Sequence, residues 1–167
     1  MKHKVKYELY CINPALAVAV GILLVVVNFS IWCAVGSPIF VIRYLSSKIF
    51  TFPLWLYGLF DFLSFGMLGF SLGADLLGVC RVNEVARYRG AFFFILGIVF
   101  SYLHHLFFFP MSSFFMALIL GIIAVAFLIF AIMDLRRVSK IASLFAMIGS
   151  LWRLYVCIFS IAALFLA

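Results

Sequence analysis

Charged residues are scarce in this chain: only 10% of its 167 residues are Asp, Glu, Lys or Arg, whereas 69% are hydrophobic. Soluble domains are about half apolar and about a quarter charged, so this composition excludes an ordinary water-soluble domain. A bilayer-spanning helix needs roughly 20 apolar residues, and the chain has room for five of them. A membrane barrel would require strict alternation, whereas the run 91–100 is apolar on every face. We therefore predict an all-α membrane protein.

Motifs that carry chemistry are also missing. The four cysteines are widely separated and form no Cys-x-x-Cys pair, so we expect small buried hydrophobes rather than metal or redox ligands. The adjacent His104 and His105 point about 100° apart on a helix, which argues against a metal site. No phosphate-binding glycine loop, nucleophile motif or closely spaced carboxylate pair is present. We predict that the protein is not an enzyme and requires no cofactor, and we assign no catalytic residue.

The net charge of +7 comes from basic residues that lie between apolar runs rather than in one patch. This pattern argues against nucleic acid as a partner and indicates lipid headgroups. Three Lys or Arg precede the first apolar run, three lie in 81–89 and three in 136–140, whereas the other side carries only Arg43 and Lys48. The positive-inside rule then predicts a cytoplasmic N-terminus, an external C-terminus and an odd number of spans. A bacterial inner membrane suits this orientation.

The apolar runs predict a single domain of five transmembrane helices. Their expected ranges are 12–35, 53–79, 91–109, 113–133 and 141–166. Residues 36–52 mix polar and apolar side chains and are expected to form an ordered or interfacial loop. Residues 81–90 are expected to form a basic loop, and Pro110 is expected to end the third helix.

Pairs of small residues four positions apart indicate where helices pack closely, because helices in lipid gain no hydrophobic free energy by touching. The pairs are Gly69 and Gly73, Ala74 and Gly78, Gly97 and Ser101, and Ala117 and Gly121. We expect these residues to pack inside one bundle. A homodimer interface is the alternative.

Ionisable side chains at membrane depth are costly unless paired or hydrated, so each is a candidate for function. At about 1.5 Å per residue, Arg153 lies roughly 18 Å from the cytoplasmic end of its helix. Asp61 and the two histidines come out at a similar level, in the outer half of the bundle. We predict an aromatic-walled pocket there, with Asp61 and Arg153 as its charged elements. The alternative is a buried Asp–Arg pair that only fixes the helix register.

Two further acidic residues, Asp75 and Asp134, lie close to the cytoplasmic basic segments. A carboxylate near a helix end is stabilised by a neighbouring cation. We expect these two residues to pair with Arg81 or Arg137.

Tryptophan, proline and glycine recur in a recognisable arrangement. Pro53, Trp55 and Gly58 open the second predicted helix, and Trp152 lies in the last one. The supporting positions are Gly69, Phe108 and Phe109, Ala117 and Leu118, and Val138 and Ser139 with Ala142. Over about two-thirds of the chain, this arrangement resembles the TspO/MBR family, the tryptophan-rich sensory proteins and mitochondrial translocator proteins. The chain departs from the family where Ser101, Tyr102 and His104 replace Asn, Trp and Trp.

The resemblance implies a pocket near the first loop that binds porphyrins, haem-like tetrapyrroles, sterols, or synthetic isoquinoline and benzodiazepine compounds. A bound porphyrin or haem is the ligand that it implies for this chain. Aromatic walls would stack such a ring, and Arg153 or His104 would meet a propionate. The expected ligand-binding residues are Trp55, Asp61, Ser101, His104, Trp152, Arg153 and Tyr155.

The leading expectation is thus a membrane protein that binds a hydrophobic or tetrapyrrole ligand, in order to sense it or to translocate it. A proton- or ion-coupled small transporter or channel subunit is one alternative, with Asp61, His104 and Arg153 as a relay. A structural subunit of a membrane complex is the other.

Overall fold

A computed structural model of the protein describes residues 13–34, 53–76 and 83–166, and all regular structure in these ranges is helical. The helices are α2 (Pro14–Ala34), α4 (Leu54–Leu76), α5 (Glu84–Phe108), α6 (Phe114–Val138) and α7 (Lys140–Leu166). All five are long and apolar enough to cross a membrane. The prediction of an all-α protein with five helices of membrane-spanning length is confirmed for the described residues.

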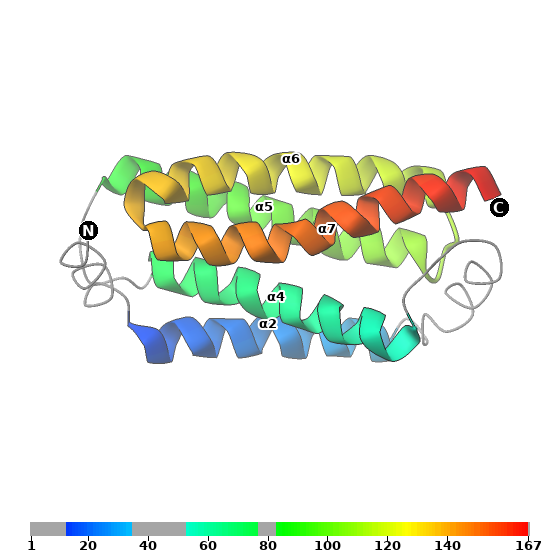
Figure 1. Cartoon of the computed structure of the whole chain (residues 1–167), viewed down its shortest axis with the longest axis horizontal. Coiled ribbons are helices and arrows are strands. Elements are labelled where there is room, and N and C mark those ends of the chain that lie inside the picture. Colours follow the sequence, from blue (N-terminus) through cyan, green and yellow to red (C-terminus); the bar gives the residue numbers. More distant parts are fainter. Residues whose placement is uncertain (1–12, 35–52, 77–82, 167) are drawn as a thin grey trace.

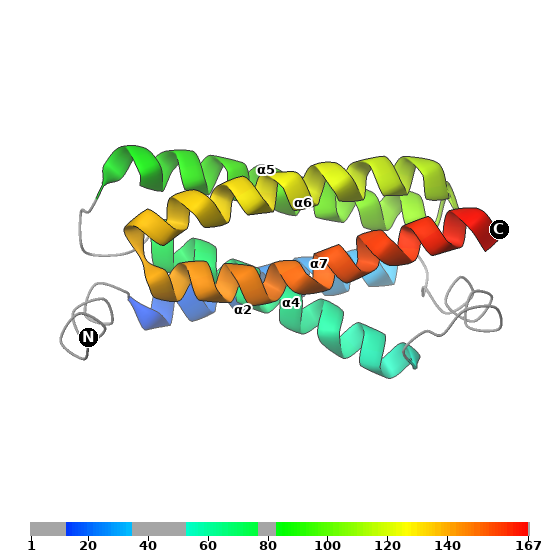
Figure 2. The same ribbon diagram turned by 45° about the horizontal axis from the view of Figure 1, so that its top comes forward.

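The helices run along the long axis of one bundle, with successive helices antiparallel (Figure 1). As a result, α2 begins at one end of the bundle and α7 ends at the other. The closest pairs are α5 with α6 and α2 with α4, while α7 packs against both α6 and α4. Figure 2 shows α7 bridging the two pairs. Residues on α4 and α7 are therefore placed to meet in the middle of the bundle.

Small residues let α2 and α4 approach to backbone contact. A Cβ added to Gly69 would lie 2.7 Å from the Cα of Gly21, and one added to Gly73 would lie 2.8 Å from the Cα of Ala17. Between α5 and α6, a Cβ on Gly97 would lie 2.8 Å from the Leu128 side chain. These small residues pack inside one bundle, as predicted. Gly78 lies outside the described residues.

The outer surface of the bundle is apolar. Exposed side chains include Ile22, Phe92 and Leu151, each more than half exposed. Buried polar and charged residues are instead turned inward, among them Asn28, Asp61, His105 and Arg153. In soluble proteins polar side chains face outward and apolar ones inward. The reverse arrangement seen here is the one required when the surrounding solvent is lipid.

Within the described residues, two helix boundaries differ from the sequence prediction by more than two residues. Helix α5 begins at Glu84 rather than at residue 91, because Asn83 adopts a left-handed conformation and its side chain accepts a hydrogen bond from the Ala86 amide. Helix α6 continues to Val138 rather than ending at 133. Both extensions carry charged residues, so they interrupt the apolar runs and were predicted to lie in loops. The predicted loop 36–52 and the end of the second predicted helix at 77–79 lie outside the described residues.

Candidate functional site

The carboxylate of Asp61 on α4 lies at the centre of a buried polar cluster. Its Oδ2 accepts a hydrogen bond from Asn28 Nδ2 on α2 at 2.7 Å, and its Oδ1 accepts one from Trp152 Nε1 on α7 at 3.1 Å. Arg153 Nη2 also donates to Oδ1, forming an ion pair. With His105, these residues form what we name the Asp61 cluster. Asp61 itself is 0% exposed.

Arg153 is held by more than this ion pair. Its Nε donates to Ser64 Oγ at 3.0 Å, and the Ser64 hydroxyl donates to the Gly149 carbonyl at 2.9 Å. The guanidinium lies over the Phe65 ring, with Cζ 4.2 Å from the ring centroid. A planar cation buried between a carboxylate and an aromatic face is stabilised by both. The ring of Phe65 in turn stacks on Tyr102, with centroids 4.4 Å apart.

His105 joins the cluster from α5. Its Nδ1 lies 3.0 Å from the Ser101 carbonyl oxygen, and its Nε2 lies 3.2 Å from both carboxylate oxygens of Asp61. A carbonyl and an ionised carboxylate only accept hydrogen bonds. Through these contacts the His105 ring links α5 to the Asp61 carboxylate on α4.

His104 belongs to a different environment, although it is the next residue along the helix. Its Nε2 lies 2.8 Å from the Ser160 hydroxyl, which itself donates to the Val156 carbonyl. Because the hydroxyl proton is used in this way, His104 Nε2 is the donor in the first bond. Ser101 donates to the Gly97 carbonyl at 2.8 Å. Together with Arg153, these two residues border a void of only about 10 Å³, which is too small for an organic ligand.

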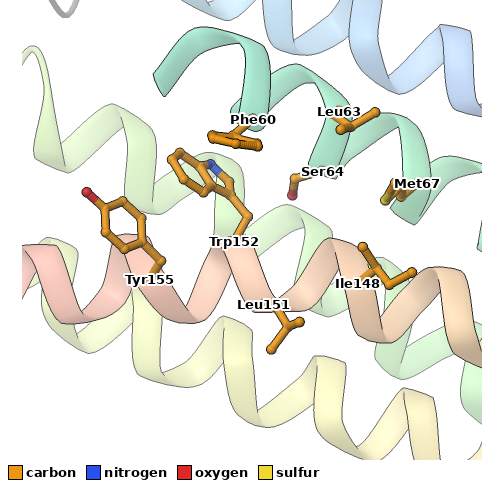
Figure 3. A pocket seen from close by; sticks show the side chains of 8 residues that line it. All are labelled: Phe60, Leu63, Ser64, Met67, Ile148, Leu151, Trp152 and Tyr155. Carbon is orange, nitrogen blue, oxygen red and sulfur yellow. The ribbon is translucent and has the colours of Figure 1, made fainter. Parts of the chain in front are cut away.

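A groove of about 380 Å³ lies between α4 and α7, directly beside the Asp61 cluster. Its lining residues, shown in Figure 3, are Phe60, Leu63, Ser64, Met67, Ile148, Leu151, Trp152 and Tyr155. Three of them form an aromatic wall: the Trp152 ring packs against Phe60 with a centroid distance of 5.2 Å and stacks on Tyr155 at 4.7 Å. Since Trp152 also donates to Asp61, the wall of the groove is tied to the buried cluster.

The groove opens on the apolar outer surface of the bundle rather than toward the bundle axis. Leu63 and Leu151, which line the groove, are 48% and 60% exposed. Ser64, a polar residue of the lining, is 3% exposed. The groove therefore presents mainly apolar and aromatic surface. A volume of this size is within the range of small-molecule sites, about 300–1,000 Å³.

The structure divides the predicted site residues into three groups. Asp61, Trp152 and Arg153 come together in the Asp61 cluster, and Tyr155 lines the groove with Trp152. Ser101 and His104 lie on α5, away from the groove. Trp55 is 70% exposed and lines none of the described pockets. Of the ionisable residues predicted to lie at one level of the bundle, Asp61, Arg153 and His105 are in contact.

Several residues of the site were not predicted as binding residues. Asn28 and Ser64 hydrogen-bond to Asp61 and Arg153, and Phe60 forms part of the aromatic wall. Asn28 had a visible signal, since it follows an apolar run and an amide is costly in a membrane helix. Phe60 had none, because phenylalanine is common throughout this chain.

Other acidic residues pair near one end of the bundle. Asp134 binds Arg89 through two bonds of 2.7 Å and lies 3.9 Å from Arg137. Asp75 lies 3.9 Å from Arg87. The predicted pairing of Asp134 with Arg137 is therefore confirmed, but Arg89 is its closer partner, and the partner of Asp75 is Arg87 instead of Arg137. Arg81 lies outside the described residues.

No protein-family model, curated protein or solved structure matches this chain. The resemblance to the TspO/MBR family therefore stays a prediction from the motifs. Among the described residues, no group of three or more His, Cys, Asp or Glu side chains is placed to hold a metal ion.

Proposed function

We propose that this protein is a membrane-embedded binding protein for a flat hydrophobic ligand, which it takes up from the bilayer into the groove between α4 and α7. A receptor or carrier of the TspO/MBR kind would use such a site. The observation that carries the proposal is the aromatic wall of Phe60, Trp152 and Tyr155 on a groove of about 380 Å³. Aromatic surfaces that are already in place stack a planar ligand at little cost in side-chain ordering.

The Asp61 cluster supports this proposal by fixing the wall. The indole of Trp152 is held by its bond to Asp61, and Asp61 is held from α2, α5 and α7. A side chain that is oriented in this way presents one face to the groove before any ligand arrives. Preorganisation of this kind increases affinity.

The recognised part of a tetrapyrrole would be its ring system rather than its propionates. Arg153 is 5% exposed, pairs with Asp61 and does not line the groove. Within the groove lining, Ser64 is the residue that connects to Arg153. We therefore propose ring stacking as the basis of binding, with acidic substituents left at the membrane interface.

Filling the groove should weaken ligand binding. The substitution Leu63→Trp places an indole in the groove at a position that is already half exposed to lipid, so folding is expected to persist. Saturable binding of protoporphyrin IX to the purified protein, followed by the shift of its absorption band, should weaken about tenfold or more. The matched control is Leu59→Trp, which is 54% exposed on the preceding turn of α4 and outside the groove. Equal binding by both variants, or none by the unmodified protein, would reject the site.

We also propose that the N-terminus lies in the cytoplasm and the C-terminus outside, in a bacterial inner membrane. Nine basic residues on one side against two on the other support this orientation. Alkaline phosphatase is active only outside the cytoplasm, so fusions after Pro110 and after Ala167 should be active and one after Ser139 inactive. The reverse pattern would overturn the orientation.

A further inference from the structure

Three polar atoms at the interface of α2 and α4 are buried without a hydrogen-bond partner among the described residues. They are Asn28 Oδ1, Trp32 Nε1 and the hydroxyl of Tyr57. Asn28 is fully buried and Tyr57 is 1% exposed, so neither reaches bulk water. Buried polar groups are nearly always paired, and each exception calls for a missing partner. Three exceptions on neighbouring residues therefore call for polar partners at this place in the bundle.

These residues lie within about one helical turn of one another. Asn28 and Trp32 are four residues apart and so share one face of α2. The ring of Trp32 stacks on that of Tyr57, with centroids 6.3 Å apart. Tyr57 is four residues before Asp61, and Asp61 binds Asn28. We name Asn28, Trp32 and Tyr57 the polar seam.

The polar seam is separate from the groove between α4 and α7. The indole of Trp152 lies between them, because it packs edge-on against Tyr57 at 5.2 Å and against Phe60 at 5.2 Å. The polar seam lies near the end of the bundle where α2 ends at Ala34 and α4 begins at Leu54. Trp32 is its partly exposed member, so a ligand would enter past the edge of this indole.

The unpaired atoms specify the chemistry of their missing partner. The bond from Asn28 Nδ2 to Asp61 fixes the amide orientation, so Asn28 Oδ1 requires a donor. Trp32 Nε1 can only donate and requires an acceptor, whereas the Tyr57 hydroxyl can do either. A carboxylate or phosphate has no proton for Asn28, and an ammonium has no lone pair for Trp32. A hydroxyl group supplies both.

We propose that the polar seam is a second binding site, which takes the uncharged hydroxyl group of a hydrophobic alcohol. The hydroxyl oxygen accepts from Trp32 Nε1, its proton goes to Asn28 Oδ1, and Tyr57 completes the shell. The aromatic rings of Trp32, Tyr57 and Phe109 flank the carbon chain or ring next to the hydroxyl. This site does not depend on a ligand in the groove.

Pyrene-labelled decanol, decanoic acid, decylamine and decane test the class of the polar group, with energy transfer from tryptophan to pyrene as the readout. The full-length protein in lipid nanodiscs should bind the alcohol roughly five- to tenfold more tightly than the hydrocarbon, as expected for hydrogen bonds to a neutral group. The acid and the amine should show no such gain. Equal affinities for alcohol and hydrocarbon, or a preference for the acid, would overturn the proposal and leave ordered water as the partner.

The substitution Tyr57→Phe tests whether the alcohol binds at the polar seam. It removes a hydroxyl that has no partner in the free protein, so the melting temperature should stay the same or rise. The preference for the alcohol should fall several-fold, with hydrocarbon and protoporphyrin IX binding unchanged. The matched control is Tyr102→Phe, because the Tyr102 hydroxyl is already bonded to the Leu24 carbonyl at 3.0 Å. That variant should melt at a lower temperature and keep the alcohol preference. Loss of the preference in Tyr102→Phe but not in Tyr57→Phe would reject the polar seam.

Discussion

Replacing Arg153 with methionine should destabilise the protein by about 3–5 kcal/mol, the cost of leaving one member of a buried ion pair without its partner. Asp61 is 0% exposed, and its remaining partners are the neutral donors Asn28 and Trp152 and the His105 ring, at a longer distance of 3.2 Å. Hydrogen bonds from neutral groups compensate a buried charge less well than a cation does. Equilibrium unfolding in mixed detergent micelles, followed by circular dichroism, measures the change.

A double substitution separates the net contribution of the ion pair to stability from the cost of removing only one of its members. In Asp61→Asn with Arg153→Met, no charge from the pair remains buried, so much of the lost stability should return. A full recovery of stability would mean that the ion pair adds no net stability and only fixes the helix register. If Arg153→Met alone is as stable as the unmodified protein, then the ion pair does not stabilise the bundle and Asp61 is held by its other partners.

The ion pair of Arg89 with Asp134 provides the matched control. Its geometry is good, with two bonds of 2.7 Å, but the Arg89 side chain is 51% exposed. An exposed pair gains little, because solvent screens its charges. Arg89→Met should therefore cost much less stability than Arg153→Met. An equal cost for both substitutions would show that burial does not set the energetics of the Asp61 cluster.

The level of this cluster in the bundle could be predicted because straight helices in one bilayer convert residue number into depth. Counting at about 1.5 Å per residue placed Asp61, the histidines and Arg153 in one layer, and the structure brings Asp61, His105 and Arg153 into contact. Helix rotation was not predictable in the same way. Adjacent residues point about 100° apart, so only the packing of α5 on its neighbours selects His105 over His104.

The exposure of Trp55 could have been predicted from its spacing to Asp61 along the helix. It lies six residues before Asp61, which corresponds to about 240° around the helix and therefore to another face. The structure accordingly leaves Trp55 70% exposed, while Tyr57, four residues before Asp61, is buried. Trp55 was predicted to bind ligand because of its position in the motif. Its angular position around the helix, relative to Asp61, was not considered.

The groove itself was beyond the sequence for a physical reason. Its wall is made by residues of α4 and α7 that are some 90 positions apart, such as Phe60 and Trp152. Whether two apolar faces leave a groove or close it depends on side-chain shapes across the interface, and hydropathy carries no such information. The polar seam was hidden for the same reason, because an unpaired atom can be recognised only once all its neighbours are known.

The substitution Gly69→Ala should destabilise the bundle by about 1–3 kcal/mol, although it adds a single methyl group. That carbon would lie 2.7 Å from both the Cα of Gly21 and the carbonyl oxygen of Val20. Because these are backbone atoms, the clash can be relieved only by moving α2 away from α4. Helix α2 has its principal contacts with α4, so its amide hydrogens should also exchange faster in the variant.

Gly66→Ala on the preceding turn of α4 is the control for Gly69→Ala. Its added carbon would meet only a methyl group of Val25, at 3.3 Å, which a small side-chain movement relieves. A change of less than about 1 kcal/mol is expected there. The comparison also decides between the two interpretations of the small-residue pairs. Packing within one bundle predicts a loss that is independent of protein concentration, whereas a homodimer interface predicts one that grows on dilution. Since Gly69 is buried against α2, the loss should be the same at every concentration, and a dilution-dependent loss would require a second copy of the chain at this face.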